Sequence, residues 1–181
     1  MTKTINIEHN AGNINIGDSF EYKTESAINE LLKNLASRPF KHQTSFRRQP
    51  TQTIVKIKHN NLVNKTHVFR QYQEYSETIE SAYIDIDSII PFGKSTILRN
   101  LSDLYYAALD ELDIDCLTSS PDIAKIKHHS NFILEYVIQK LKNSSFESSN
   151  GPSFKEHVEQ GINVVVAHAF IECIIFDNPS T

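Results

Sequence analysis

The chain has 181 residues and a net charge of −4, with 39% hydrophobic and 22% charged residues. This composition is typical of a globular protein, and the length suffices for one core but not for two comfortable domains. Only five glycines and six prolines are present, which argues against a loop-rich β fold.

Residues 5–18, INIEHNAGNINIGD, predict a β-hairpin at the start of the chain. Isoleucine and asparagine alternate on both sides of Asn10-Ala11-Gly12, a segment that tolerates the positive φ of a turn. Two strands alone are only marginally stable in water. We therefore expect the hairpin to pack on another copy or another subunit, as an assembly element. Its apolar side chains are Ile5, Ile7, Ile14 and Ile16.

Apolar residues at helical spacing predict a series of helices after the hairpin. A helix over about 24–38 has Thr24 as its N-cap and ends before Pro39, whereas residues 53–63 fit either a strand or a short helix. The later helices are expected over 66–85, over 95–112 with Ser95 as cap, over 123–141 after a cap at Ser120, and over 154–176. The last segment is apolar nearly all round after Ile162, so it should be central.

These elements predict a mainly α fold, a helical bundle with a short N-terminal β-hairpin appendage. We expect residues 1–38 to form the appendage of hairpin and helix, 39–52 a basic linker and 53–181 the helical domain. The N-terminus lacks the apolar region of a signal peptide. The longest apolar run, residues 162–176, is shorter than the roughly 20 residues that span a bilayer. The expected protein is soluble and cytoplasmic, without a membrane partner.

Charge is distributed very unevenly along the chain. From Leu31 to Gln73 there is no Asp or Glu but nine Lys or Arg, while the remaining residues carry a balance of −13. Such asymmetry indicates a partner, either a nucleic-acid backbone or an acidic protein surface. One stretch interleaves bases with aromatics, which suits phosphate contact plus base stacking, although a solvated linker explains the pattern equally well. Its residues are Arg38, Phe40, Lys41, Phe46, Arg47 and Arg48.

His168 and Glu172 lie four residues apart on the most apolar helix, so they should share a face. We expect a buried polar pair with a structural role, ahead of a subunit contact or a metal site. No third ligand, nucleophile motif or phosphate loop accompanies them. The sequence therefore predicts no catalytic residue, no cofactor and no metal, and a protein that is not an enzyme.

Two segments, KIKHNNL at 56–62 and VVVAHAFIECIIFDNP at 164–179, resemble the helical C-terminal domains of ABC three-component systems. That broad group includes Lamassu-type bacterial anti-phage systems. The resemblance covers residues 53–179, and AHAFIEC is its most distinctive part. It implies a helical domain that docks onto an assembly of an SMC-like ABC ATPase and a small middle component. In the family such domains usually follow a toxic effector domain, and residues 1–52 contain no enzyme.

The leading hypothesis is thus a non-catalytic helical subunit or adaptor of a bacterial anti-phage defence complex. Its expected partners are the ATPase and an effector on another polypeptide, with possible DNA contact through the basic window and oligomerisation through the hairpin. The alternative is a free-standing nucleic-acid-binding protein that uses residues 31–73. An enzyme built on His168 and Glu172 ranks last.

Overall fold

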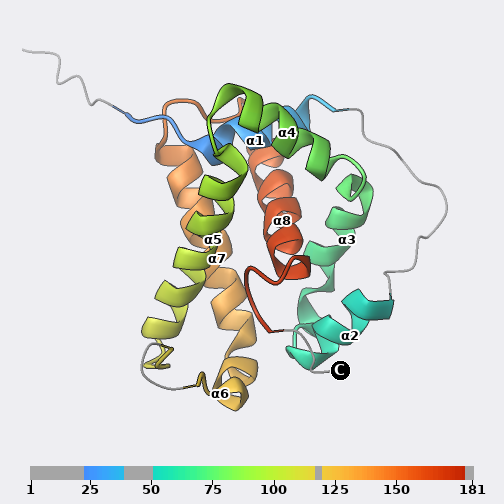
Figure 1. Cartoon of the computed structure of the whole chain (residues 1–181), viewed down its shortest axis with the longest axis vertical. Coiled ribbons are helices and arrows are strands. Elements are labelled where there is room, and N and C mark those ends of the chain that lie inside the picture. Colours follow the sequence, from blue (N-terminus) through green and yellow to red (C-terminus); the bar gives the residue numbers. More distant parts are fainter. Residues whose placement is uncertain (1–22, 39–50, 117–119, 178–181) are drawn as a thin grey trace, which may run out of the picture.

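The computed structural model describes residues 23–38, 51–116 and 120–177. Within these residues it contains eight α-helices, one 3-10 helix and no strand (Figure 1). The expected mainly α fold is confirmed, whereas the predicted hairpin lies outside the described residues. The elements are α1 Ala27–Ala36, α2 Thr51–His59, η1 Val63–Lys65, α3 Thr66–Tyr75, α4 Ile79–Ile89, α5 Gly93–Asp110, α6 Ile123–His128, α7 Ser130–Glu147 and α8 Lys155–Ile171.

Helix α8 runs through the middle of the bundle and contacts α1, α3, α5 and α7 (Figure 1). Every residue from Val164 to Phe170 is buried. The sequence predicts this central position, because an apolar surface around the whole helix needs neighbours on all sides. Among the described helices none is long and apolar enough to cross a membrane.

Helix α1 is part of the core. Its apolar stripe packs against α8 and α4, and Leu31 and Leu32 are fully buried. The Leu32 side chain packs directly on α8 at Gly161, where an added Cβ would lie 2.5 Å from Leu32 Cδ2. The helix was expected in an appendage of residues 1–38, and in the structure it packs within the bundle against α4 and α8.

The start of α1 is held by a residue far along the chain. Ser26 is the N-cap, in place of the expected Thr24, and its own side chain makes no capping hydrogen bond. Instead, the Ser26 N–H donates to Asn150 Oδ1 at 2.8 Å, and Asn150 Nδ2 donates to the Ser26 carbonyl at 3.0 Å. A side chain from the α7–α8 loop thus fixes where α1 begins.

Asn29, Ser145 and Asn150 form a buried hydrogen-bonded group that we call the amide network. Asn29 is fully buried, and its Nδ2 donates to the Ser145 carbonyl at 3.0 Å and to Asn150 Oδ1 at 3.3 Å. The Ser145 hydroxyl donates back to Asn29 Oδ1. The network ties α1 to the end of α7, with a partner for each Asn29 side-chain group.

The predicted helix over 66–85 is two helices, because residues 76–78 form a turn. The Thr78 N–H and hydroxyl both bond the Tyr75 carbonyl, at 2.9 Å and 3.1 Å. The turn lets α3 pack on α8 while α4 packs on α1 and α5. A continuous straight helix could not contact both sets of neighbours, so tertiary packing overrides the helical period here.

Two other helix starts differ from the sequence expectation. Helix α5 begins at Gly93 rather than at a Ser95 cap, and the Asp87 carboxylate accepts the Lys94 N–H at 2.8 Å. Asp122 caps α6 in place of Ser120.

The chain also breaks at His129, so the predicted helix over 123–141 is divided into α6 and α7. The His129 backbone has φ −100° and ψ 11°, outside the α-helical region. The break precedes Ser130, which is buried and whose hydroxyl donates to the Asn61 carbonyl at 3.3 Å.

Candidate functional site

A group of ionisable side chains surrounds His168, which is 1% exposed. Tyr72 of α3 and Tyr83 of α4 flank its ring, with ring centroids 5.9 Å and 5.3 Å away. Glu80 Oε1 lies 3.4 Å from His168 Nε2, and Glu80 Oε2 accepts a 2.6 Å hydrogen bond from Lys94 Nζ. We call these five residues the His168 cluster.

Hydrogen bonding within the His168 cluster is incomplete. The contact from the Tyr72 hydroxyl to His168 Nδ1 is long, at 3.5 Å. Within the part of the chain that the structure describes, His168 Nε2 and the Tyr83 hydroxyl are buried without a hydrogen-bond partner. An unpaired buried polar atom costs about 1–3 kcal/mol, so the cluster is a weak point of the core.

Electrostatics favour the neutral form of His168. Burial lowers the pKa of its imidazole, an effect that Glu80 and Glu172 oppose and Lys94 reinforces. Burial also disfavours the charged forms of Tyr72 and Tyr83. It raises the pKa of both phenols, which therefore remain protonated near neutral pH. The cluster is therefore a group of uncharged rings in contact with the Glu80–Lys94 ion pair.

The predicted buried pair of His168 and Glu172 is corrected in one respect. His168 is buried as expected, but Glu172 is exposed because α8 ends at Ile171. The carboxylate that lies at ion-pair distance from His168 belongs to Glu80 on a different helix. Among the described residues, no group of three or more His, Cys, Asp or Glu is arranged to hold a metal ion.

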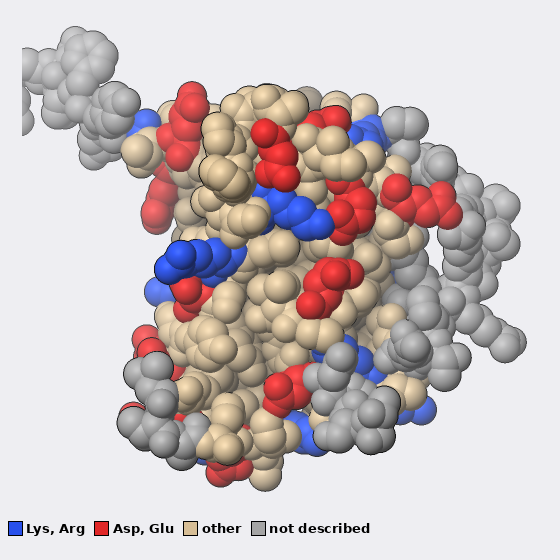
Figure 2. Space-filling view, viewed as in Figure 1, with Lys and Arg blue, Asp and Glu red and all other residues tan. Residues whose placement is uncertain are grey.

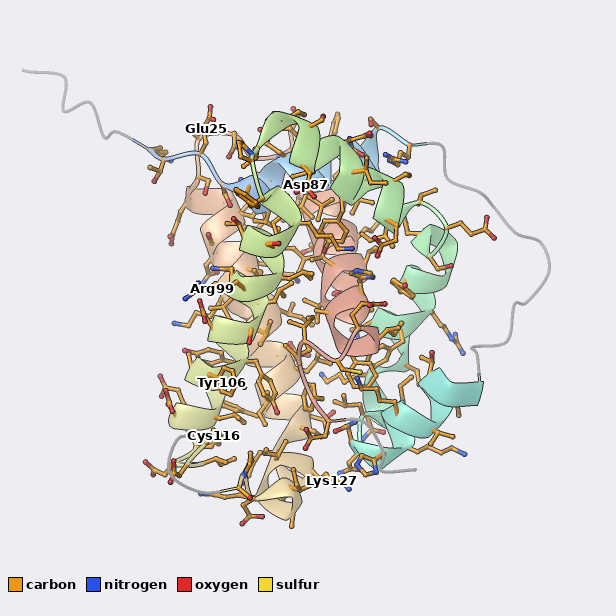
Figure 3. The ribbon with its side chains drawn as sticks, viewed as in Figure 1. Glu25, Asp87, Arg99, Tyr106, Cys116 and Lys127 are labelled. Atoms are coloured by element: carbon orange, nitrogen blue, oxygen red, sulfur yellow. The ribbon has the colours of Figure 1, made fainter. Side chains whose placement is uncertain are left out.

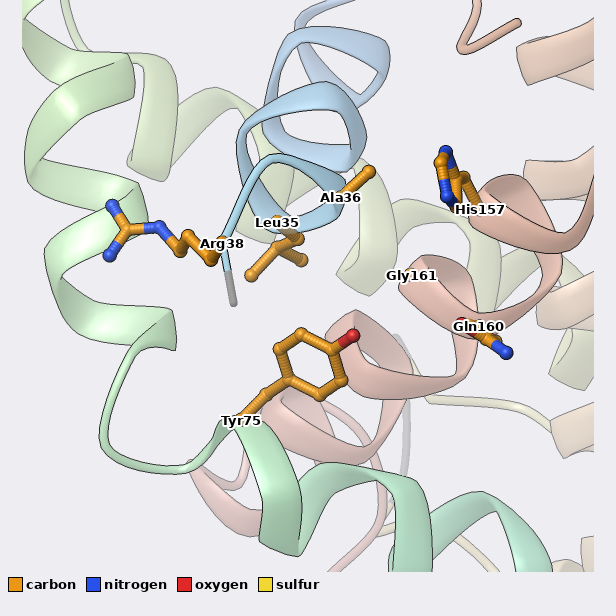
Figure 4. A pocket seen from close by; sticks show the side chains of 7 residues that line it. All are labelled: Leu35, Ala36, Arg38, Tyr75, His157, Gln160 and Gly161. Atoms are coloured by element: carbon orange, nitrogen blue, oxygen red, sulfur yellow. The ribbon is translucent and has the colours of Figure 1, made fainter. Parts of the chain in front are cut away.

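A cavity of about 210 Å³ lies where α1, α3 and α8 meet (Figure 4). Tyr75, His157 and Gln160 supply its polar lining, whereas the Arg38 side chain extends away from it. His168 is not among its lining residues. The cavity therefore brings together no acid, base and nucleophile from which a reaction could be assigned.

Several bases of the acid-free window are paired with acids from elsewhere in the chain. Arg38 contacts Asp85 at 2.7 Å and also bonds Ser81 and Asn34. Lys33 and Lys65 pair with Glu30 and Glu135, respectively. Figure 2 shows acidic and basic side chains interspersed on one face of the molecule. The other predicted binding residues, Phe40, Lys41, Phe46, Arg47 and Arg48, lie outside the described residues.

Lys56 has a different role, because it is only 4% exposed. Its ammonium donates to the Phe170 carbonyl and to Cys173 Sγ at 3.2 Å, and it lies 4.7 Å from the centre of the Phe170 ring. A cation near the carboxyl end of α8 complements the helix dipole. Asn60 Nδ2 also donates to the Asp177 carbonyl at 2.9 Å. The segments 56–62 and 164–179 thus meet in space.

A groove of about 240 Å³ lies between α2 and α3. Its lining combines apolar side chains with two exposed cations. The lining residues are Ile54, Ile57, Lys58, Val63, Thr66, Phe69 and Arg70. Ile54 is 38% exposed and Val63 is 53% exposed. An apolar floor flanked by cations suits an apolar side chain that is followed or preceded by a carboxylate.

Sequence reasoning missed Glu80, Lys56 and the α2–α3 groove. Glu80 lies in a segment that was expected to be mid-helix, and nothing in its spacing relates it to His168. The groove depends on α2, whose segment was ambiguous between strand and helix. The one available signal was that 56–62 and 164–179 are the segments that carry the family resemblance.

The helical architecture and these junctions define a small α-helical domain in the described part of the chain. Residues 26–177 match the model of C-terminal domain 10 (CTD10) of the ABC-three component (ABC-3C) systems, and the chain belongs to this family. No curated protein and no solved structure matches the chain. The match includes α1, in agreement with the packing of that helix in the core.

Proposed function

We propose that this chain is a non-catalytic assembly subunit of a bacterial anti-phage defence complex, in which it joins an SMC-like ABC ATPase. Family membership over residues 26–177 supports a role in a multicomponent system. The finer assignment follows from the resemblance to domains that dock onto such an assembly. In this proposal the effector chemistry resides on another polypeptide.

The observation that carries a docking role is the cation-flanked apolar groove between α2 and α3. Lys58 and Arg70 are both exposed and line the same groove as Ile54 and Val63. Hydrophobic contacts supply affinity, and cations at the rim select a partner of opposite charge. We therefore propose that the groove receives a partner segment in which an aliphatic side chain stands next to Asp or Glu.

Co-purification with the proteins encoded beside this chain tests the proposal. Replacing Ile54 by Asp should weaken association about tenfold or more, because a carboxylate would enter an apolar contact. Ile84→Asp is the matched control, since Ile84 is 69% exposed on α4 and does not line the groove. Failure of the wild-type chain to bind any neighbour would refute the assembly function. Equal binding by both variants would refute only the groove.

Charge reversal tests the selectivity of the groove separately. Lys58→Glu with Arg70→Glu should weaken binding and flatten its salt dependence, because attraction to an acidic segment is lost. Arg99→Glu serves as a control on α5, on the other side of the bundle from α2 (Figure 3). If the control has the same effect, the charge of the whole chain rather than the groove controls binding.

The predicted N-terminal hairpin is proposed as a second assembly element, through Ile5, Ile7, Ile14 and Ile16. The family match begins at residue 26, so deletion of residues 1–18 removes nothing from the matched domain. The deleted protein should keep its helical circular dichroism but show a lower mass by light scattering. If the deletion instead unfolds the protein, the hairpin segment is part of the core.

Nucleic-acid contact by the basic window remains the alternative function. Arg38 is committed to Asp85, so the contact would rely on Lys41, Arg47 and Arg48. Replacing these three by Ala should weaken DNA or RNA binding and reduce its salt dependence, because fewer counterions are released. Unchanged binding and salt slope would eliminate this alternative.

A further inference from the structure

The junction between α2 and the turn after α8 contains an amine and a thiol side by side. Lys56 Nζ lies 3.2 Å from Cys173 Sγ. The lysine is 4% exposed, whereas Cys173 is exposed. The sulfur is thus open to small solutes, while the nitrogen next to it is shielded from solvent.

We propose that Lys56 and Cys173 form an oxidative modification site, in which peroxide links Nζ to Sγ through a single oxygen atom. Three features of the junction support this product. The lysine is held at both ends, by α2 and by its hydrogen bond to the Phe170 carbonyl. Cys173 has a positive φ of 60°, a conformation fixed by the tight turn that follows Ile171. An oxygen bridge requires less approach of the two atoms than a direct nitrogen–sulfur bond.

The chemistry balances with two equivalents of hydrogen peroxide. In the first step the Cys173 sulfur attacks peroxide, the O–O bond breaks, and a sulfenic acid and one water form. In the second step the Lys56 ammonium releases a proton, and the N–O bond then forms while one N–H and the sulfenic O–H are lost. The second peroxide accepts these two electrons and two hydrogens and becomes two waters. The sulfur and nitrogen are oxidised, and peroxide is the only species reduced.

Burial of Lys56 directs the reaction inward. The oxygen that peroxide adds to Cys173 Sγ lies next to the Lys56 nitrogen, which bulk solvent does not reach. Cys116 provides a contrast within the same chain. It is only half-buried, yet burial raises the pKa of its thiol and nearby acidic residues reinforce the effect. The raised pKa leaves less of Cys116 as the thiolate that reacts with peroxide.

The crosslink would alter the mechanics of the fold. It joins residues 56 and 173, so it closes most of the described chain into one loop and lowers the entropy of the unfolded state. It also fixes α2, which supplies Ile54, Ile57 and Lys58 to the α2–α3 groove. Oxidation is therefore expected to raise the urea midpoint of unfolding, and reduction to restore it.

Mass spectrometry of the full chain tests the proposal. A few equivalents of hydrogen peroxide should increase the intact mass by about 14 Da, the gain of one oxygen and loss of two hydrogens. Proteolysis should release one linked peptide that contains both Lys56 and Cys173. Dithiothreitol should return the mass and the urea midpoint to their starting values.

Matched variants identify the atoms involved. Cys173→Ser and Lys56→Arg should each abolish the linked peptide, whereas Cys116→Ser should keep it. Because Lys56→Arg could disturb folding, the linked peptide in the wild-type digest is the decisive readout. A sulfinic or sulfonic acid at Cys173 without a link would overturn the proposal. So would a disulfide-linked dimer, or a mass loss of about 2 Da that indicates a direct nitrogen–sulfur bond.

Discussion

The two buried polar centres of this domain differ in how completely their hydrogen bonds are made. In the amide network, both the side-chain NH2 and the side-chain carbonyl of Asn29 are hydrogen-bonded. In the His168 cluster, His168 Nε2 and the Tyr83 hydroxyl have no hydrogen-bond partner among the described residues. Both centres connect helices that are distant in the sequence. Burial alone therefore does not say whether a polar group stabilises a fold.

The largest effect is expected in the amide network. Asn29→Ala would leave the buried Ser145 hydroxyl and carbonyl without their Asn29 partner, although Asn150 keeps its bonds to Ser26, and this should lower the free energy of unfolding by about 2–4 kcal/mol. Urea denaturation measures this loss. Asn143→Ala on the exposed face of α7 is the control and should change stability by less than about 0.5 kcal/mol. Similar losses for both variants would remove the distinction between the network and the surface.

The His168 cluster should respond to pH instead. The folded pKa of His168 is lowered, so below about pH 6.5 the unfolded chain binds more protons than the folded chain. Stability should therefore fall on acidification, with a contribution from this residue of at most about 1.4 kcal/mol per pH unit. Urea midpoints measured between about pH 7.5 and 5, the range in which histidine titrates, give the slope.

His168→Gln removes the titrating group and should reduce that slope. His128→Gln is the matched control, because His128 is exposed at the end of α6. An equal slope in wild type and in His168→Gln would assign the acid sensitivity to other groups. The same variant tests the hypothesis that the chain is an enzyme built on His168 and Glu172. Loss of an activity of the chain in His168→Gln, without a change of fold, would support that hypothesis.

Tyr83→Phe should have a smaller effect than Asn29→Ala, and in the opposite direction. The hydroxyl is buried without a partner, so its removal eliminates an unpaired polar atom and should leave stability unchanged or raise it by up to about 1 kcal/mol. Tyr105→Phe is the comparison variant. The ring centroid of Tyr105 lies 5.3 Å from that of Phe176. Destabilisation by Tyr83→Phe above about 1 kcal/mol would mean that the hydroxyl is hydrogen-bonded in solution.

Glu80→Gln is expected to have the smallest effect on stability near neutral pH. It removes an exposed ion pair with Lys94, which contributes about 0–1 kcal/mol. It also removes the carboxylate that opposes the lowering of the His168 pKa, so that pKa should fall further. Histidine NMR titration measures the shift. Glu111→Gln, an exposed substitution at the end of α5, should leave the His168 titration unchanged.

The difference between these two polar centres also explains which parts of the candidate site the sequence predicts. The central place of α8 follows from its uniform apolarity, and the burial of His168 follows from that helix. The partner of His168 does not follow, because spacing relates only residues on the same helix. Glu172 was chosen for its i+4 position, but the helix ends one residue before it. Glu80 contacts His168 through tertiary packing that no local period encodes.

Helix breaks show the same limit. The turn at 76–78 and the break at His129 lie within segments of continuous helical period. The turn at 76–78 directs α3 and α4 toward different neighbours, so it depends on the arrangement of the bundle. The acid-free window was a correct compositional observation. Which bases of the window are paired, buried or exposed depends on where Asp85, Glu135 and the end of α8 lie in the fold.

The clamp of Asn150 on Ser26 also has a consequence for the order of folding. Residues 26 and 150 are 124 positions apart, and the contact of Lys56 with Phe170 spans 114 positions. Helices α1 and α2 therefore leave the ribosome long before the segments that bury them. Contacts of such high sequence separation form slowly, and exposed apolar stripes promote aggregation in the meantime. Completion of the bundle should thus await synthesis of α8, and nascent chains truncated before residue 150 should remain sensitive to protease.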